Sequence, residues 1–132
     1  MTAMLEYVAP TEPLLIVEDD AALRRVLTIA MRHAGFFVDQ AKTGQEALAR
    51  LERGEVSGVL LDLGLPDGRS GDVLTWLHNH EDQPPWLVLS AMDPADAAQI
   101  DDSIGGRFVP KPFDPWALIE RVKVMTSDEG GK

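Results

Sequence analysis

The sequence contains no cysteine and no long hydrophobic run, and it has about half as many basic as acidic residues. Without cysteine, disulfide bonds, thiol catalysis and cysteine-bound zinc are excluded. The apolar runs are much shorter than the roughly 20 residues that a membrane-spanning helix needs. The N-terminal stretch MTAMLEYVAPTEP is acidic and contains proline, unlike a signal peptide. We therefore expect a cytoplasmic protein that does not enter a membrane.

The shortage of basic residues also bears on the binding partners. Lys and Arg number 12 against 22 Asp and Glu, which gives a net charge of −10. Proteins that bind nucleic acids draw most of their affinity from Lys and Arg at the phosphates, so direct binding of DNA or RNA is not expected. The acidic excess is explained either by a solvated surface or by a cluster of acids that holds a metal ion.

Apolar residues make up 45% of the 132 positions, enough for one globular domain with a full core. Five apolar segments alternate with helical patterns. The predicted strands are Leu14–Val17, Phe36–Ala41, Val59–Leu61, Trp86–Ser90 and Phe108–Val109. This alternation favours a doubly wound α/β fold, a parallel sheet with helices on both faces.

Several short motifs predict where helices begin. Thr43-Gly44-Gln45-Glu46 reads as a capping box, and Asp93-Pro94 and Asp114-Pro115 each combine an N-cap with proline at the first helical position. Asp20 is expected to cap the first helix, and Asp67-Gly68 to form a turn. We expect one domain over residues 13–125, with flexible segments at 1–12 and 126–132.

Polar side chains stand where the predicted strands end. They are Glu18 and Asp19 after the first strand, Asp62 at the third, Ser90 at the fourth and Lys111 after the fifth. Ligands of such sheets bind beyond the carboxyl ends of the strands. Carboxylates about 4 Å apart repel by roughly 4 kcal/mol per pair at an effective dielectric constant near 20. Mg²⁺ removes this cost, and a carboxylate beside it can accept a phosphoryl group.

The segments LLIVEDD, VLLDLGLPDGRSG, LVLSA and FVPKPF, in this order, resemble the receiver domain of two-component response regulators. The resemblance covers roughly residues 13–125. It implies a flavodoxin-like (βα)5 three-layer sandwich with strand order 2-1-3-4-5. It also implies that a sensor histidine kinase or a histidine phosphotransfer protein phosphorylates the domain, which then acts on a downstream protein or an output domain.

The resemblance also implies a role for each residue of the site. Asp62 matches the phosphoacceptor, Glu18 and Asp19 match the acidic pair of the Mg²⁺ site, and Gly64 matches the residue whose carbonyl binds the metal. Ser90 matches the switch hydroxyl, and Lys111 matches the lysine that binds a phosphoryl oxygen. Phe108 matches the switch aromatic, and Pro112 matches a proline that usually follows a cis peptide bond.

Two other functions match part of this pattern. A Mg²⁺-dependent phosphohydrolase with an aspartyl-phosphate intermediate typically has a second Asp two positions after the nucleophile, where this chain has Gly64. A degenerate receiver would serve only as a docking module, but Asp19, Asp62, Ser90 and Lys111 are all present.

The chain departs from the family pattern before Lys111. Ser90 and Lys111 are 21 positions apart, one fewer than usual, and the adjacent Gly105 and Gly106 weaken the end of the fourth helix. Arg107 stands where receivers of winged-helix transcription factors usually have Asp. In those proteins this Asp pairs across a dimer with an arginine that Arg121 matches here. We therefore expect charge repulsion to oppose that symmetric dimer.

Overall fold

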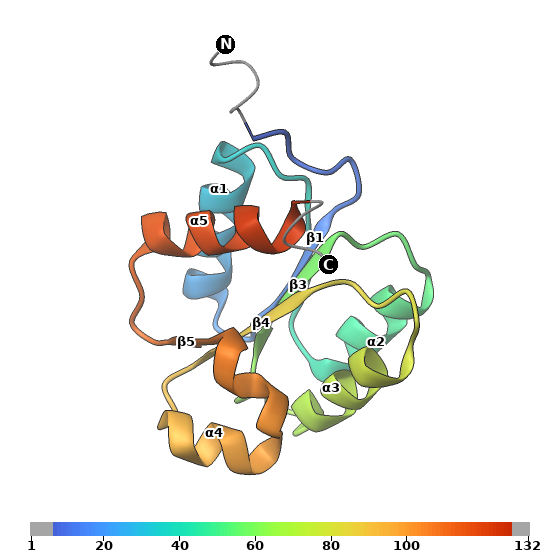
Figure 1. Cartoon of the computed structure of the whole chain (residues 1–132), viewed down its shortest axis with the longest axis vertical. Helices are drawn as coiled ribbons and strands as arrows, with labels where there is room; N and C mark the ends of the chain where they lie inside the picture. Colours follow the sequence, from blue (N-terminus) through green and yellow to red (C-terminus); the bar gives the residue numbers. More distant parts are fainter. Residues whose placement is uncertain (1–6, 128–132) are drawn as a thin grey trace.

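The computed structural model describes residues 7–127 and confirms the predicted α/β fold (Figure 1). Five parallel strands form one sheet in the order β2-β1-β3-β4-β5. The strands are β1 (Leu14–Val17), β2 (Val38–Ala41), β3 (Gly58–Asp62), β4 (Trp86–Ser90) and β5 (Phe108–Pro110). The helices are α1 (Ala21–His33), α2 (Gly44–Glu52), α3 (Ser70–Asn79), α4 (Pro94–Ile100) and α5 (Pro115–Thr126), with the 3₁₀ helix η2 (Asp102–Arg107) before β5.

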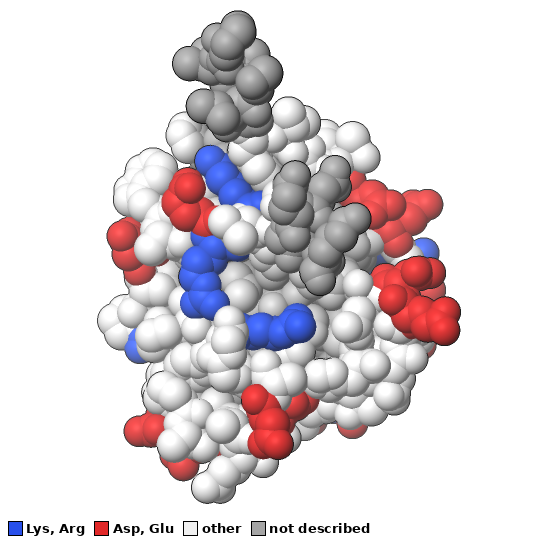
Figure 2. Space-filling model, viewed as in Figure 1, with Lys and Arg blue, Asp and Glu red and all other residues white. Residues whose placement is uncertain are grey.

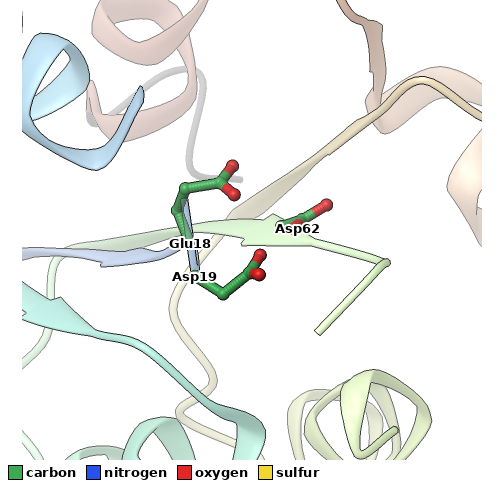
Figure 3. Close-up of side chains that lie close together, drawn as sticks. All are labelled: Glu18, Asp19 and Asp62. Atoms are coloured by element: carbon green, nitrogen blue, oxygen red, sulfur yellow. The ribbon is translucent and has the colours of Figure 1, made fainter. Parts of the chain in front are cut away.

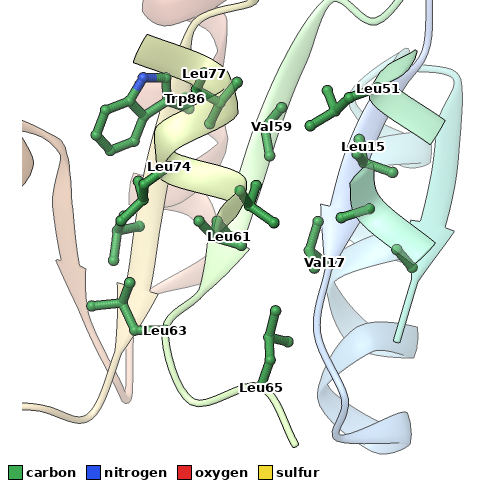
Figure 4. Close-up of a cluster of buried hydrophobic side chains, with 14 of the residues drawn as sticks. Leu15, Val17, Leu51, Val59, Leu61, Leu63, Leu65, Leu74, Leu77 and Trp86 are labelled. Carbon is green, nitrogen blue, oxygen red and sulfur yellow. The ribbon is translucent and has the colours of Figure 1, made fainter. Parts of the chain in front are cut away.

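Helices cover both faces of the sheet: α1 and α5 lie on one side, and α2 and α3 on the other (Figure 1). Successive strand side chains point to opposite faces, so each strand contributes to two cores. Leu15 and Val17 pack with residues of α2 and α3, a cluster shown in Figure 4. Leu14 and Ile16 pack with residues of α1 and α5. The sheet is therefore buried on both faces, which explains why its strands are continuously apolar.

The predicted helix caps are confirmed. Asp20, Thr43, Asp93 and Asp114 each accept hydrogen bonds from backbone N–H groups in the first turn of the helix that follows. Such caps are worth about 1 kcal/mol each. In α2 the Glu46 carboxylate binds the N–H of Lys42 rather than that of Thr43, so the capping box is shifted by one residue.

Two predicted elements differ in detail. β2 begins at Val38 instead of Phe36, because the N–H groups of Gly35 and Phe36 bond back to carbonyls at the end of α1. α4 ends early, at Ile100, and both glycines of the Gly105-Gly106 pair lie in η2 rather than in an α-helix. The weak helix end expected from these glycines is confirmed.

The two ends of the described chain meet. The Tyr7 hydroxyl hydrogen-bonds to Thr126 Oγ1 at 2.5 Å, and the Tyr7 ring packs 5.8 Å from the ring of Phe36. Residues 1–6 and 128–132, the outer parts of the predicted flexible segments, lie outside the described residues. No helix within residues 7–127 has the length and apolar character needed to cross a membrane.

Candidate functional site

The carboxylates of Glu18, Asp19 and Asp62 converge at the carboxyl ends of β1 and β3 (Figure 3). The two strands are adjacent and parallel, and Val17 pairs with Leu61, so the residues that follow each strand emerge side by side. One oxygen from each carboxylate lies within 4.8 Å of the others. The predicted gathering of acids is therefore present in the fold.

The three acids differ in burial. Glu18 is 1% exposed and Asp62 is 5% exposed, whereas Asp19 faces solvent. Burial raises the pKa of Glu18, its hydrogen bond with Lys111 lowers it, and the charge of Asp62 raises it again, so that the net result is a raised pKa. The site therefore disfavours the ionised form of Glu18 when only protein groups surround it.

Lys111 reaches this cluster from beyond β5. Its Nζ lies 2.9 Å from Glu18 Oε1 and 3.3 Å from Asp62 Oδ1. Burial lowers the pKa of Lys111, but the hydrogen bond to Glu18 and the charge of Asp62 outweigh burial and leave the pKa raised. Its backbone N–H donates to the carbonyl of Ser90 at 2.9 Å, and the peptide bond to Pro112 is cis.

Ser90 and Gly64 complete the edge of the site. Ser90 is 5% exposed, and its Oγ accepts the N–H of Met92 at 3.0 Å. The N–H of Gly64 donates to Asp62 Oδ1 at 3.1 Å, which orients the carboxylate. A Cβ at Gly64 would lie 3.8 Å from that oxygen, an ordinary contact, so sterics alone do not demand glycine here.

Phe108 does not lie in the carboxylate cluster. It begins β5, is half-buried and packs against the core on the α2 and α3 side. Its carbonyl accepts a hydrogen bond from Arg121 at 2.8 Å. The role of Phe108 as a switch aromatic stays a prediction.

Sequence reasoning missed two side chains that hold the backbone of the site. Ser70 Oγ lies 3.0 Å from the carbonyl oxygen of Asp62 and 2.8 Å from that of Leu63. Arg24 Nη1 donates to the carbonyl of Glu18 at 2.9 Å. Both contacts are short in sequence, since each joins a helix to the end of the strand that precedes it, six to eight positions earlier, but no motif marks them.

Asp67 also does more than form the predicted turn. Its carboxylate accepts the N–H groups of Gly44 and Gln45 at 3.1 and 3.0 Å, and so caps α2 from the loop after β3. It also accepts the N–H of Arg69. Desolvation raises the pKa of Asp67, but the backbone hydrogen bonds together lower it by more, so the pKa lies below its ordinary value.

The donors present fit a hard divalent cation. Three carboxylates meet here, and within residues 7–127 only the Lys111 ammonium forms an ion pair with any of them. Lys111 therefore leaves negative charge uncompensated. Carboxylate oxygens are also the ligands that Mg²⁺ prefers.

Comparison with known proteins agrees with this geometry. The family model of the response regulator receiver domain matches residues 14–123. The transcriptional regulatory protein PmrA of Pectobacterium parmentieri is 36% identical in an alignment of 118 residues that covers 85% of this chain and 51% of that protein. The chain thus spans about half the length of the curated relatives it matches.

Solved structures show the same fold. The non-phosphorylated receiver domain of HemR from Leptospira biflexa has a TM-score of 0.78 at 30% identity, over 89% of this chain and 95% of that one. Response regulator TrrA from Thermotoga maritima was solved in complex with Mg²⁺-BeF. Its structure has a TM-score of 0.75 at 24% identity, and the match covers 86% of this chain and 97% of that one. The chain belongs to the response regulator receiver domain family, the phosphorylation-dependent switches of two-component systems.

Proposed function

We propose that Asp62 is the residue of this receiver that accepts the phosphoryl group, with Mg²⁺ bound beside it. The observation that carries this proposal is the position of Asp62, buried at the end of β3 between two other carboxylates and the Lys111 ammonium. Asp62 Oδ1 already accepts the Gly64 N–H and contacts Lys111, whereas Oδ2 has no partner among the described residues.

In the proposed reaction, a carboxylate oxygen of Asp62 attacks the phosphorus of a phosphohistidine. The new oxygen–phosphorus bond forms as the phosphorus–nitrogen bond breaks, and the electron pair of that bond stays on the imidazole nitrogen. Phosphoryl transfer depends mainly on positioning and on neutralising the phosphoryl oxygens. The Lys111 ammonium would bind one of these oxygens, and the Ser90 hydroxyl would bind another once phosphorylation draws it inward.

Glu18, Asp19, Asp62 and the Gly64 carbonyl would hold the Mg²⁺ ion, which when bound neutralises the carboxylates and the incoming phosphoryl oxygens. The complex of the Thermotoga maritima response regulator with Mg²⁺-BeF is consistent with Mg²⁺ binding at such a site. In this proposal the domain acts in the cytoplasm on its own phosphorylation and dephosphorylation, and on no other substrate.

The donor would be a sensor histidine kinase or a histidine phosphotransfer protein. Phosphorylation adds charge at the edge of the sheet, and the elements next to Ser90 and Lys111 would transmit the change. They are α4, β5 and α5, and Phe108 lies among them. Output would pass to a downstream protein or to a further domain.

Incubation with acetyl phosphate and Mg²⁺, followed by mass spectrometry of the intact protein, tests the acceptor. We expect the wild type to gain one phosphoryl group and Asp62→Asn to gain none. Asp72→Asn is the matched control, because Asp72 is an exposed acid on the neighbouring helix α3 and should leave labelling unchanged. Labelling of Asp62→Asn at the wild-type level would disprove the assignment.

A further inference from the structure

A hollow of about 490 Å³ lies between α1 and the edge strand β2. Arg24, Arg25 and Arg32 of α1 line it, together with Ile29 and Gln40. None of the three carboxylates of the candidate phosphoacceptor site lines this hollow. It is therefore a separate feature of the surface.

The arginine side chains of this hollow have no carboxylate within ion-pair distance in the described part of the chain. Within residues 7–127, Arg24, Arg25 and Arg32 form no ion pair with any carboxylate, although the chain carries 22 acidic residues. The acid on the adjoining strand, Asp39, is already paired with Arg50 at 2.6 Å. Three guanidinium groups are thus concentrated on one side of an acidic protein.

One of these guanidinium groups is held in place while keeping donors available. Arg24 Nε donates to Gln40 Oε1 at 3.1 Å and its Nη1 to the carbonyl of Glu18, while Nη2 has no partner in the described part of the chain. Arg32 makes a single long contact, from Nη2 to the carbonyl of Val38 at 3.5 Å. The Arg25 side chain is exposed, and its guanidinium has no hydrogen-bond partner among residues 7–127. A ligand would meet donors that are partly preorganised, which lowers the entropic cost of binding.

We propose that this hollow binds a small phosphate-bearing anion of the diphosphate class. The planar guanidinium fork matches the oxygens of phosphate groups and binds them through charge-assisted hydrogen bonds. Three positive charges suit a ligand with several negative charges better than one with a single charge. Since Arg24 also holds the carbonyl of Glu18, the bound anion would lie next to the backbone that supports the acidic cluster.

Titration with inorganic pyrophosphate, followed by amide NMR at about 0.15 M salt without divalent metal, tests the proposal. We expect saturable shifts at amides of α1 and β2, with those of Gly64, Ser90 and Lys111 unmoved. Orthophosphate should bind about fivefold or more weakly, because it offers fewer charge-assisted hydrogen bonds. Shifts centred on Ser90 and Lys111 would place the anion in the phosphoacceptor site and overturn the proposal.

A second experiment compares pyrophosphate binding by two double variants of equal net charge. Arg25→Gln with Arg32→Gln should weaken pyrophosphate binding by about tenfold or more, because two charge-assisted contacts are lost. Lys42→Gln with Arg53→Gln removes two exposed charges outside the hollow and should change the affinity less than about twofold. Arg24 is left intact because it supports the backbone at Glu18. An equal loss in both double variants would show general charge attraction and would refute a specific site.

Discussion

The Nζ atom of Lys111 lies 2.9 Å from Oε1 of Glu18, although 93 positions separate the two residues in the chain. The Glu18 side chain is 1% exposed and that of Lys111 is 20% exposed, so the pair is largely withdrawn from water. Removing one partner of a buried ion pair leaves the other charge uncompensated, which costs roughly 3–5 kcal/mol when burial is complete. Lys111 is partly solvated, and this reduces the cost.

We therefore predict that Lys111→Met lowers the free energy of unfolding by about 2–3 kcal/mol at pH 7 without metal. Urea denaturation measures this loss. Adding Glu18→Gln to the same variant should restore part of the stability, because the buried carboxylate is then gone. Saturating Mg²⁺ should also stabilise Lys111→Met more than the wild type, and equal stabilisation of the two proteins would contradict the prediction.

A second prediction concerns Asp19 and Mg²⁺. Mg²⁺ should raise the melting temperature of the wild type, with a stabilisation of about 2.7 kcal/mol at a hundredfold excess over Kd. Asp19→Asn should show a smaller increase, because one ligand has lost its charge, and should be slightly more stable than the wild type without metal. Asp72→Asn, an acid outside the cluster, should respond to Mg²⁺ like the wild type. Identical Mg²⁺ responses of Asp19→Asn and the wild type would rule out Asp19 as a ligand.

The contact between α2 and the loop before α3 leads to a third prediction. A Cβ at Gly44 would lie 2.6 Å from Arg69 Cβ and 3.0 Å from the Arg69 backbone. Gly44→Ala should therefore destabilise the fold by about 1–3 kcal/mol, the usual cost of overpacking. Gly71→Ala is the control, since no heavy atom lies within 4 Å of its added Cβ and the position is helical. The control should be neutral or stabilise by up to about 1 kcal/mol. Equal urea midpoints for the two variants would refute the steric argument.

A fourth prediction concerns pH and the contact between α3 and the turn after α4. Asp101 Oδ2 lies 2.7 Å from His78 Nε2, and Asp101 Oδ1 accepts both the N–H and the hydroxyl of Ser103. Desolvation raises the pKa of Asp101, but the hydrogen bonds from Ser103 and His78 lower it more, and the net pKa is low. A carboxyl group whose pKa is lower in the folded than in the unfolded state stabilises the fold at pH values above its unfolded-state pKa. This stabilisation is lost as the pH falls through its folded-state pKa.

Asp101→Asn should therefore be less stable than the wild type by about 1 kcal/mol at pH 7, and the difference should shrink below about pH 4. Urea denaturation of both proteins at several pH values from neutral to acidic measures the difference in stability and its decrease at low pH. Asp82→Asn serves as control, because Asp82 is exposed and makes no hydrogen bond within residues 7–127. A difference that stays constant over the whole pH range would contradict the assigned pKa direction.

The fifth prediction concerns dimerisation through α5. Arg107 lies over the ring of Trp86, 4.4 Å from its centroid, and Arg121 donates to the carbonyls of Gly106 and Phe108. Both arginines line one hollow of about 580 Å³, and Figure 2 shows basic side chains gathered on the face that α5 occupies. A symmetric dimer on this face would bring like charges together.

We expect the domain activated with fluoroberyllate and Mg²⁺ to remain monomeric in analytical ultracentrifugation. A tight dimer of the activated wild type would contradict this expectation. Arg107→Glu should favour the dimer, because the new carboxylate of one copy would then face Arg121 of the other. A monomer–dimer equilibrium that this variant leaves unchanged would show that like-charge repulsion is not what opposes the dimer.

Local features of the sequence were enough to predict the architecture. The bounds of Leu14–Val17 and Trp86–Ser90 agree with β1 and β4, because continuous apolar runs between polar residues define a strand buried on both faces. The starts of α4 and α5 follow from Asp-Pro pairs, whose capping chemistry involves only adjacent residues. Since parallel strands end at one edge, the gathering of Glu18, Asp19 and Asp62 was also predictable.

Only the tertiary structure decided what surrounds these residues. Glu18 and Asp19 are neighbours in the chain, yet one is buried against Lys111 and the other faces solvent. The capping of α2 by Asp67 likewise depends on how the loop after β3 packs against a helix 23 positions earlier. Such contacts depend on strand order, register and helix placement, and no local pattern encodes them. The sequence therefore determined which groups reach the site, and packing determined their burial, their partners and the direction of their pKa shifts.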